Sequence, residues 1–266
     1  MNPLVVSPAG RVYGQLRDSA DTRDKILRLT GTTVQPIAAD EGALLGAVRD
    51  QGQEGSCVGH GWQGFAAWLF RKFGPYTTAV PEFSPQDIYY LVRQLEGTLP
   101  NDAGGMVRTG AKVLNKFGVC PEVDDAYGPA TLNTPPSPQA VADAIKYKGG
   151  AYHTLPTLGD MKGCLASGYC FVDGIDVFNS FESDAVASSG EVPMPASTEQ
   201  SLGGHCTLTF GYDDKHQNLD GSQGALHKRN SWGSTWGQGG DFWLPYNYVN
   251  QYLNDAWVLH LGPAWH

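Results

Sequence analysis

Hydrophobic side chains in the first half of the chain recur at steps of three and four residues. This spacing is the period of a helix with one buried face. The clearest stretch follows the polar, glycine-rich run 51–56 and reaches residue 70. We expect a helix there, with Cys57 in its first turn. The positions that carry the pattern are Val58, Trp62, Phe65, Ala66, Leu69 and Phe70.

Residues that favour helix ends predict further helices before residue 150. Ser84 is a good N-cap, Pro85 suits the first helical position, and Gly97 ends the apolar stripe that follows them. A proline cluster at 134–138 and a glycine pair at 149–150 delimit a later, shorter helix. The predicted helices span residues 85–96, 107–117 and 138–145, and the glycine pair marks a boundary between two lobes.

The second half of the chain contains runs of aromatic and β-branched residues separated by Gly, Asn and Asp. Such runs are typical of strands. The predicted strands span residues 169–177, 206–212, 225–231, 241–245 and 256–261, after one short helix at 158–165. Helices first and strands second predict an α+β fold with a cleft between unlike lobes. We expect an N-terminal extension (1–44), a helical lobe (45–150) and an antiparallel, barrel-like β lobe (151–266).

Composition and charge leave the predicted fold unchanged, but they argue against some classes of binding partner. The formal charge of −9 is spread over 266 residues without a basic cluster, which argues against a nucleic-acid partner. The N-terminus has no basic segment followed by an apolar one, and no apolar run approaches the roughly 18 residues of a membrane span. We therefore expect a cytoplasmic protein without a membrane partner. Five cysteines are an odd number, so at least one thiol is free.

Cys57 lies where the chemistry of its thiol should be altered. The first turn of a helix presents unpaired backbone N–H groups and the positive end of the helix dipole, and both favour a thiolate. The same N–H groups can stabilise the oxyanion that forms when a thiolate attacks a carbonyl. Gln51, six residues upstream, could add a side-chain amide to this oxyanion site. Gly52 and Gly55 would allow a substrate backbone to approach closely.

A catalytic cysteine requires a base, and His205 is the best candidate among the seven histidines. It opens a predicted strand in the run Gly203-Gly-His205. A neutral amide can fix the plane of the imidazole without neutralising a thiolate–imidazolium pair. Asn230 is the candidate for this role, and Trp232, two residues later, could shield the Asn–His hydrogen bond from water.

Three motifs together resemble the signatures of the papain family of cysteine peptidases. They are Gln51-Gly-Gln-Glu-Gly-Ser-Cys57, Gly203-Gly-His205 and Asn230-Ser-Trp-Gly233, in the family's order. His205 follows Cys57 at the family's spacing, whereas Asn230 comes somewhat late. We assign the extra length to a longer hairpin loop at 213–221. The similarity covers roughly residues 45–261, in the style of the bacterial and viral branch.

This resemblance implies a cysteine-type endopeptidase that cleaves protein or peptide substrates through a thioester, with no metal or other cofactor. The implied catalytic residues are Cys57, His205, Asn230 and Gln51. An extended substrate would pair with the backbone of a glycine pair, and an apolar or moderately bulky side chain would enter the second pocket. The implied substrate-binding residues are Gly104, Gly105, Met106, Val107, Cys206 and Trp232.

Several features depart from the family pattern. Glu54 stands where papain itself has a disulfide cysteine, so that bridge must be absent. His60 adds a polar group to an otherwise buried helix. Only about 45 residues precede the catalytic turn, fewer than in the long inhibitory propeptides of lysosomal relatives, so we do not expect activation by propeptide removal. Residues 1–44 could form an edge strand, lie across the cleft as a plug, or be trimmed.

Two other function classes are compatible with the same motifs. An inactive papain-fold binding protein would have a Cys57 that alkylates no faster than an ordinary thiol. A transpeptidase or amidase would form a thioester that an added amine intercepts better than water. The sequence carries no signal for an oligomeric state.

Overall fold

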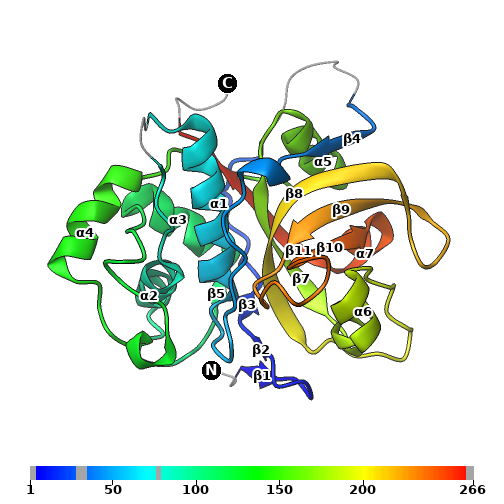
Figure 1. The fold of residues 1–266 in the computed structure, drawn as a ribbon, viewed down its shortest axis with the longest axis horizontal. Helices are drawn as coiled ribbons and strands as arrows, with labels where there is room; N and C mark the ends of the chain where they lie inside the picture. Colours follow the sequence, from blue (N-terminus) through cyan, green and yellow to red (C-terminus); the bar gives the residue numbers. More distant parts are fainter. Residues whose placement is uncertain (1–3, 28–34, 76–78, 262–266) are drawn as a thin grey trace.

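The computed structural model describes residues 4–27, 35–75 and 79–261 and has two unlike halves (Figure 1). Residues 1–3 and 28–34 of the predicted N-terminal extension lie outside these ranges. Helices occupy the left half of Figure 1, and a twisted sheet occupies the right half. This arrangement confirms the predicted α+β fold with two lobes, whereas the lobe boundary at residue 150 stays a prediction. The helices of the left half are α1 (Cys57–Phe73), α2 (Pro85–Glu96), α3 (Val107–Lys116) and α4 (Pro138–Ala144).

The ends of α2 follow directly from the local sequence. The Ser84 hydroxyl accepts a hydrogen bond from the backbone N–H of Asp87 at 2.9 Å, and Pro85 occupies the first turn. Gly97 ends the helix in the left-handed conformation, with φ of 68°. Helix α1 is almost wholly buried because it lies between the other helices and the sheet. It therefore carries Cys57 on an element that both halves hold in place.

The main sheet is antiparallel and runs in the order β10-β9-β8-β7-β11-β6. Short helices α5 (Leu158–Ala166), α6 (Asp184–Ser189) and α7 (Tyr246–Tyr252) lie around it. The long strand β8 crosses the middle of the sheet and begins at the face of α1. The strands are β6 (Tyr152–Thr154), β7 (Phe171–Val177), β8 (Gly203–Gln217), β9 (Gln223–Arg229), β10 (Asp241–Pro245) and β11 (Leu253–Leu259).

A fully buried ion pair and the hydroxyl groups that bind it link three strands of this sheet. Lys228 of β9 donates to both carboxylate oxygens of Asp173 on β7, at 2.6 and 2.5 Å. The hydroxyls of Thr207 and Thr209 on β8 also donate to Asp173, at 2.8 and 2.6 Å. A buried charge needs such partners, because water cannot reach it. The network holds β8, which carries His205, in register with both neighbours.

The structure corrects the predicted loop at 213–221. Strand β8 continues to Gln217, and only the turn at 218–222 connects it to β9. Gly221 has φ of +81° in that turn, a conformation that suits the glycine of an Asp-Gly turn. The extra length between His205 and Asn230 predicts a loop that includes residues 213–217. They form a strand because the hairpin with β9 supplies their backbone partners.

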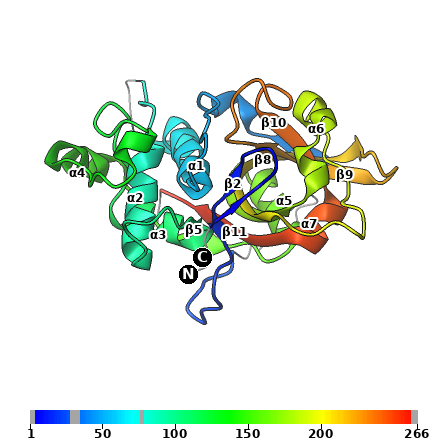
Figure 2. The same cartoon turned by 90° about the horizontal axis from the view of Figure 1, so that it is seen from below.

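The N-terminal segment does not lie outside the fold but runs between the two halves (Figure 2). A short hairpin forms from β1 (Val5–Val6) and β2 (Val12–Tyr13). Strand β3 (Gln15–Leu16) is then parallel to β5 (Gly105–Met106) on the helical side and antiparallel to β8 on the sheet side. Further along, β4 (Ala38–Asp40) pairs with the far part of β8. We call residues 4–18 the N-terminal strap.

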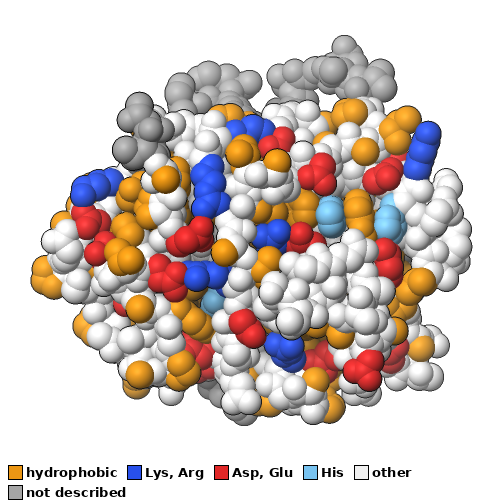
Figure 3. Space-filling model, viewed as in Figure 1, with side chains coloured by type: hydrophobic (Ala, Val, Ile, Leu, Met, Phe, Trp, Pro, Cys, Tyr) orange, Lys and Arg blue, Asp and Glu red, His pale blue; other side chains and the backbone are white. Residues whose placement is uncertain are grey.

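The surface shows no large region of one charge on the face viewed in Figure 3, where acidic and basic side chains are intermixed. Across the described ranges, no helix is both long and apolar enough to span a membrane. All five cysteines are free and buried.

Candidate active site

Cys57 begins α1 and is completely buried. The loop before it is fixed from both halves of the molecule. Backbone N–H of Gln51 donates to Ser231 O at 2.9 Å, and backbone N–H of Gly55 donates to a carboxylate oxygen of Asp102 at 3.0 Å. Gly52 adopts φ of +59°, which only glycine takes without strain. The helix start thus places the thiol at the junction of the helices with β8.

His205 and Asn230 form a buried pair on β8 and at the end of β9. The imidazole Nε2 lies 2.8 Å from Asn230 Oδ1, and because an amide oxygen can only accept, the ring must donate here. Asn230 Oδ1 also accepts from the backbone N–H of Ser231 at 2.8 Å, which fixes the amide. Trp232 stacks on His205 with ring centroids 4.9 Å apart. His205 Nδ1 has no hydrogen-bond partner among the described residues, so it is available to a reacting group.

Gln51 presents its amide N–H groups toward the strap. Ser231 Oγ donates to Gln51 Oε1 at 2.6 Å, which fixes the orientation of the amide. Gln51 Nε2 then donates to Glu54 O at 2.9 Å and, more weakly, to Val12 O at 3.4 Å. A carbonyl oxygen of the strap therefore meets the side chain that the sequence suggested as an oxyanion donor.

The strap lies directly on Cys57. Gly14 O accepts from the backbone N–H of Gly105 at 2.7 Å, and the backbone N–H of Gly14 acts on the Cys57 thiol. A Cβ at Gly14 would lie 1.9 Å from Gly55 O, so only glycine fits between the strap and the catalytic loop. A Cβ at Gly104, where φ is +71°, would lie 2.0 Å from Gly14 O. The cleft is thus filled by the protein's own chain.

Aromatic and charged contacts fix the strap on the other side of the thiol. The Tyr13 ring meets His205 edge-on at 6.0 Å, and the Arg11 guanidinium lies 4.6 Å from the Trp232 ring centroid. Tyr13 and Ser7 hydroxyls both donate to Glu182 Oε1, at 2.5 Å. None of these strap residues was singled out from the sequence, because nothing local in residues 4–18 indicates what they contact.

Burial shifts the pKa of both Cys57 and His205. It raises the pKa of the Cys57 thiol to about 11, although backbone N–H groups of Cys206 and Gly14 oppose this. Burial also lowers the pKa of His205 to about 4, although the hydrogen bond that its ring donates to Asn230 opposes this. The expected thiolate at the helix start is therefore wrong for the covered site, because loss of water outweighs the helix dipole and the backbone donors. Burial thus favours the neutral thiol and the neutral imidazole.

The surroundings of His60 explain its burial, whereas Glu54 is buried without a hydrogen-bond partner among the described residues. His60 lies one turn into α1, where its Nδ1 is 3.1 Å from Ser56 O and its ring meets Tyr127 edge-on at 4.6 Å. Burial lowers the pKa of His60 to about 4, so it is a neutral core histidine near neutral pH. Glu54 is buried beside Tyr127 and Asp102, and burial raises the pKa of its carboxyl.

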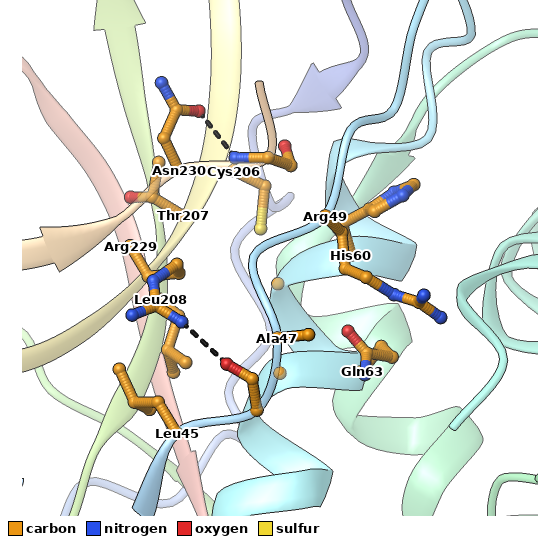
Figure 4. A pocket seen from close by; sticks show the side chains of 14 residues that line it. Leu45, Ala47, Arg49, His60, Gln63, Cys206, Thr207, Leu208, Arg229 and Asn230 are labelled. Atoms are coloured by element: carbon orange, nitrogen blue, oxygen red, sulfur yellow. Dashed lines mark hydrogen bonds between the residues drawn. The ribbon is translucent and has the colours of Figure 1, made fainter. Parts of the chain in front are cut away.

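The structure places the expected substrate-binding residues in different surroundings. Gly105 and Met106 form β5 and already pair with an extended chain, the strap. Val107 is buried at the start of α3, where its carbonyl accepts from Trp62 Nε1 at 2.9 Å. Cys206 lines a cavity of about 20 Å³ between α1 and β8 (Figure 4). The cavity has room for about one water molecule, and the role of Cys206 in a second pocket stays a prediction.

One group of side chains has the composition of a metal site. Ligand atoms of Asp87, Cys120 and Asp125 lie within 4.8 Å of one another near the start of α2. However, Asp87 Oδ2 accepts from the backbone N–H of Cys120 at 3.0 Å. Burial is the main cause that raises the pKa of both carboxyls to about 6, so protonation can reduce the repulsion between them. The group is explained by packing between α2 and the following loop.

Comparisons with known proteins identify the family of the chain. No protein-family model matches the chain. A mimivirus (Acanthamoeba polyphaga mimivirus) protein described as an uncharacterised peptidase C1-like protein is 35% identical over 221 residues, which are 79% of this chain and 68% of the relative.

Solved structures extend this similarity to the whole fold. The crystal structure of xylellain, a cysteine protease from Xylella fastidiosa, matches with a TM-score of 0.86 and 31% identity, covering 99% of each chain. Digestive procathepsin L 3 of Tenebrio molitor matches with a TM-score of 0.70 at 16% identity, over 90% of this chain and 75% of that one, which supports the fold alone. The chain therefore belongs to the papain-like cysteine peptidases and is a hydrolase of that family.

Proposed function

We propose that the protein is an endopeptidase in which Cys57 is the nucleophile and His205 is the general base and acid. Asn230 orients His205, and Gln51 together with the Cys57 N–H holds the oxyanion. The observation that supports this assignment best is the buried His205–Asn230 pair, in which Nε2 is hydrogen-bonded and Nδ1 has no partner among the described residues.

The reaction follows from these positions once the strap has left. The Cys57 thiol passes its proton to His205 Nδ1, and the sulfur attacks the carbonyl carbon of the scissile bond. The carbonyl oxygen takes up the negative charge, which Gln51 Nε2 and the Cys57 N–H stabilise. His205 then protonates the leaving nitrogen as the C–N bond breaks. Water, deprotonated by His205, hydrolyses the thioester and restores the thiol.

Access to the site requires movement of the strap. Gly14 occupies the space over the thiol, and Val12 O takes the hydrogen bond that a substrate carbonyl would receive from Gln51. A peptide substrate and the strap cannot bind together. We propose that residues 4–18 act as a plug, the second of the three roles left open by the sequence.

Peptide hydrolysis by three full-length proteins tests the assignment: the wild type, Cys57→Ala and Cys164→Ala. Cys164 is a matched control because it is also a buried thiol, on α5. We expect Cys57→Ala to lose all hydrolysis above background and Cys164→Ala to keep it. Equal hydrolysis by the wild type and Cys57→Ala would exclude Cys57 as the nucleophile.

An added amine distinguishes hydrolysis from transfer. With glycine amide present, an endopeptidase releases mainly the free carboxylate, whereas a transpeptidase forms mainly the amine adduct. Mass spectrometry of the products measures this ratio, and we expect the carboxylate to dominate.

A further inference from the structure

Gln51, the proposed oxyanion donor, has a hydrogen-bond partner at every polar group. On the sheet side, its backbone N–H donates to Ser231 O at 2.9 Å, and its Oε1 accepts from Ser231 Oγ at 2.6 Å. The other two groups bond outside the sheet. The backbone oxygen accepts from the Tyr127 hydroxyl at 2.8 Å, and Nε2 donates to Glu54 O at 2.9 Å. The direction of the Gln51 amide therefore depends on both halves of the molecule.

A single peptide unit connects Gln51 to Asp102. Its carbonyl, Glu54 O, accepts from Gln51 Nε2, and its N–H, on Gly55, donates to both carboxylate oxygens of Asp102, at 3.2 and 3.0 Å. A peptide unit is planar, so the direction of the N–H also sets the direction of the carbonyl. Asp102 thus fixes the carbonyl that Gln51 Nε2 contacts.

Tyr89 orients Asp102 and connects it to the segment before β5. The Tyr89 hydroxyl donates to Asp102 Oδ1 and accepts from the backbone N–H of Gly104 at 3.0 Å. Its ring is fully buried, and the Arg93 guanidinium lies 4.5 Å from the ring centroid. Burial raises the pKa of Tyr89, so its hydroxyl stays protonated and can donate. One carboxylate therefore holds both the catalytic loop, residues 51–56, and the segment that leads into β5.

Tyr127, in the loop after α3, joins the two ends of the catalytic loop. Because its hydroxyl proton is donated to Gln51 O, its oxygen accepts from Ser56 Oγ at 2.6 Å. Gln51 begins the catalytic loop, and Ser56 directly precedes Cys57. Burial raises the pKa of Tyr127 as well, so the donor is present near neutral pH. Tyr127 thus fixes Gln51 relative to the start of α1.

The catalytic loop needs such support because nothing covalent fixes it. Gly52 and Gly55 give it wide backbone freedom. Glu54 stands where papain has a disulfide cysteine, and all five cysteines of this chain are free. Donors stabilise an oxyanion best when they are already in place as the charge develops. A hydroxyl and a carboxylate from the helical half provide this support here.

We propose that Asp102 and Tyr127 are positioning residues, which hold the Gln51 amide where the oxyanion forms. The proposal rests on the proposed endopeptidase function, because it assigns the oxyanion to Gln51. It makes two distinct claims. Asp102 and Tyr127 order the catalytic loop, and this order lowers the barrier of the chemical step through Gln51. The first claim can be tested without catalysis.

Steady-state kinetics on one peptide substrate tests the second claim. Tyr127→Phe and Asp102→Ala are made in the full-length wild type and in the Gln51→Ala variant. A residue that acts through Gln51 has no effect once the Gln51 amide is absent, whereas a general loss of stability adds to the effect of Gln51→Ala. A change in docking of the strap alters the apparent KM instead of kcat, because strap and substrate exclude each other.

Two control variants remove similar hydrogen bonds away from the site. Tyr246→Phe deletes a hydroxyl that donates to Asp214 at 2.6 Å, and Tyr246 is half-buried like Tyr127. Asp220→Ala deletes a carboxylate that accepts from the backbone N–H of Ser222 at 2.9 Å. Thermal unfolding checks that every variant is folded.

We expect Tyr127→Phe and Asp102→Ala each to lower kcat about tenfold and to leave KM within about threefold, with kcat of both controls within about twofold of the wild type. In the Gln51→Ala background the same changes should alter kcat by less than about twofold. Unchanged kcat in the wild-type background would overturn the proposal, and so would equal losses in both backgrounds. If Asp102→Ala does not fold, Tyr127→Phe, which lacks only one oxygen atom, carries the test.

Hydrogen exchange of the amides in residues 51–57, measured by mass spectrometry, tests the first claim. We expect exchange to become about tenfold faster in Asp102→Ala, which frees the Gly55 N–H, and in Tyr127→Phe, with no change in the controls. Equal exchange in the wild type and both variants would overturn the proposal. If the wild type cuts no peptide, the proposed function fails, and exchange alone decides whether Asp102 and Tyr127 hold the loop.

Discussion

Gly14→Ala should expose Cys57 without altering any of the proposed catalytic residues. The added Cβ would lie 1.9 Å from Gly55 O, whereas ordinary van der Waals contact requires at least 3.4 Å. The strap must therefore move by about 1.5 Å, or the catalytic loop must yield. Gly55 cannot yield easily, because its backbone N–H is held by Asp102 at 3.0 Å. A movement of the strap would also lengthen the 2.7 Å hydrogen bond from Gly105 N–H to Gly14 O.

The size of the effect follows from the cost of overpacking. Inserting one methyl group into a well-packed site costs about 1–3 kcal/mol. Here that cost falls on the covered state alone, since an open strap has no clash. The open fraction should rise by about 5- to 150-fold. Cys57 has no exposed surface in the covered state, so its alkylation rate should rise by the same factor.

The assay is iodoacetamide labelling of the full-length protein, with the Cys57 peptide followed over time. Gly128→Ala is the control, because Gly128 has an extended φ of 166° and a Cβ there would have no atom within 4 Å. Cys164 provides an internal reference for global unfolding. Equal Cys57 labelling in Gly14→Ala and the wild type would refute the covering role of the strap. Parallel acceleration of Cys57 and Cys164 would show unfolding instead of uncovering.

Further changes have distinct expected outcomes. Asn230→Ala should lower kcat/KM and shift its acid limb, because the amide no longer holds His205 Nε2 at 2.8 Å; a pH–rate profile measures this, and an unchanged profile would remove Asn230 from the mechanism. Gln51→Ala should reduce kcat by about 100- to 1,000-fold if the amide binds the oxyanion, as steady-state kinetics would reveal. Lys228→Met should destabilise the fold by about 3–5 kcal/mol, since it leaves Asp173 buried without its counter-charge. Urea unfolding measures that loss, and Lys146→Met, whose side chain is 64% exposed, should change the free energy of unfolding far less, because solvent screens a surface ion pair. A similar small loss for both lysine variants would contradict the importance of the buried pair.

Local sequence signals predicted the elements that depend on local interactions. Helix α2 is an example, because Ser84, Pro85 and Gly97 define both of its ends through contacts within the helix itself. The α+β fold followed from the change in hydrophobic period. Helix α7 was missed, since it starts after Pro245 without a side-chain cap.

The candidate site shows the same division between local and distant effects. The partnership of His205 with Asn230 was foreseen from residue type and order, and the geometry supports it. The covered state was not foreseen, because Gly14 is explained only by Gly55 and Gly104, which are far away in the sequence. The ionisation of Cys57 depends on that cover as well. A helix start favours a thiolate only where water or a counter-charge can reach it.

The strap and the later segment 38–40 both pair with β8, and this determines how release of the strap behaves. Gln15 pairs with Gly204 near the start of β8, while residues 38–40 pair with positions 211–213 of the same strand. Leu27, between them, is anchored in the core. A strap that leaves the cysteine thus remains tethered to its own molecule at an effective concentration of about millimolar. Uncovering is then unimolecular and independent of protein concentration, and only a cut in the chain between Asp18 and Leu27 would make it permanent.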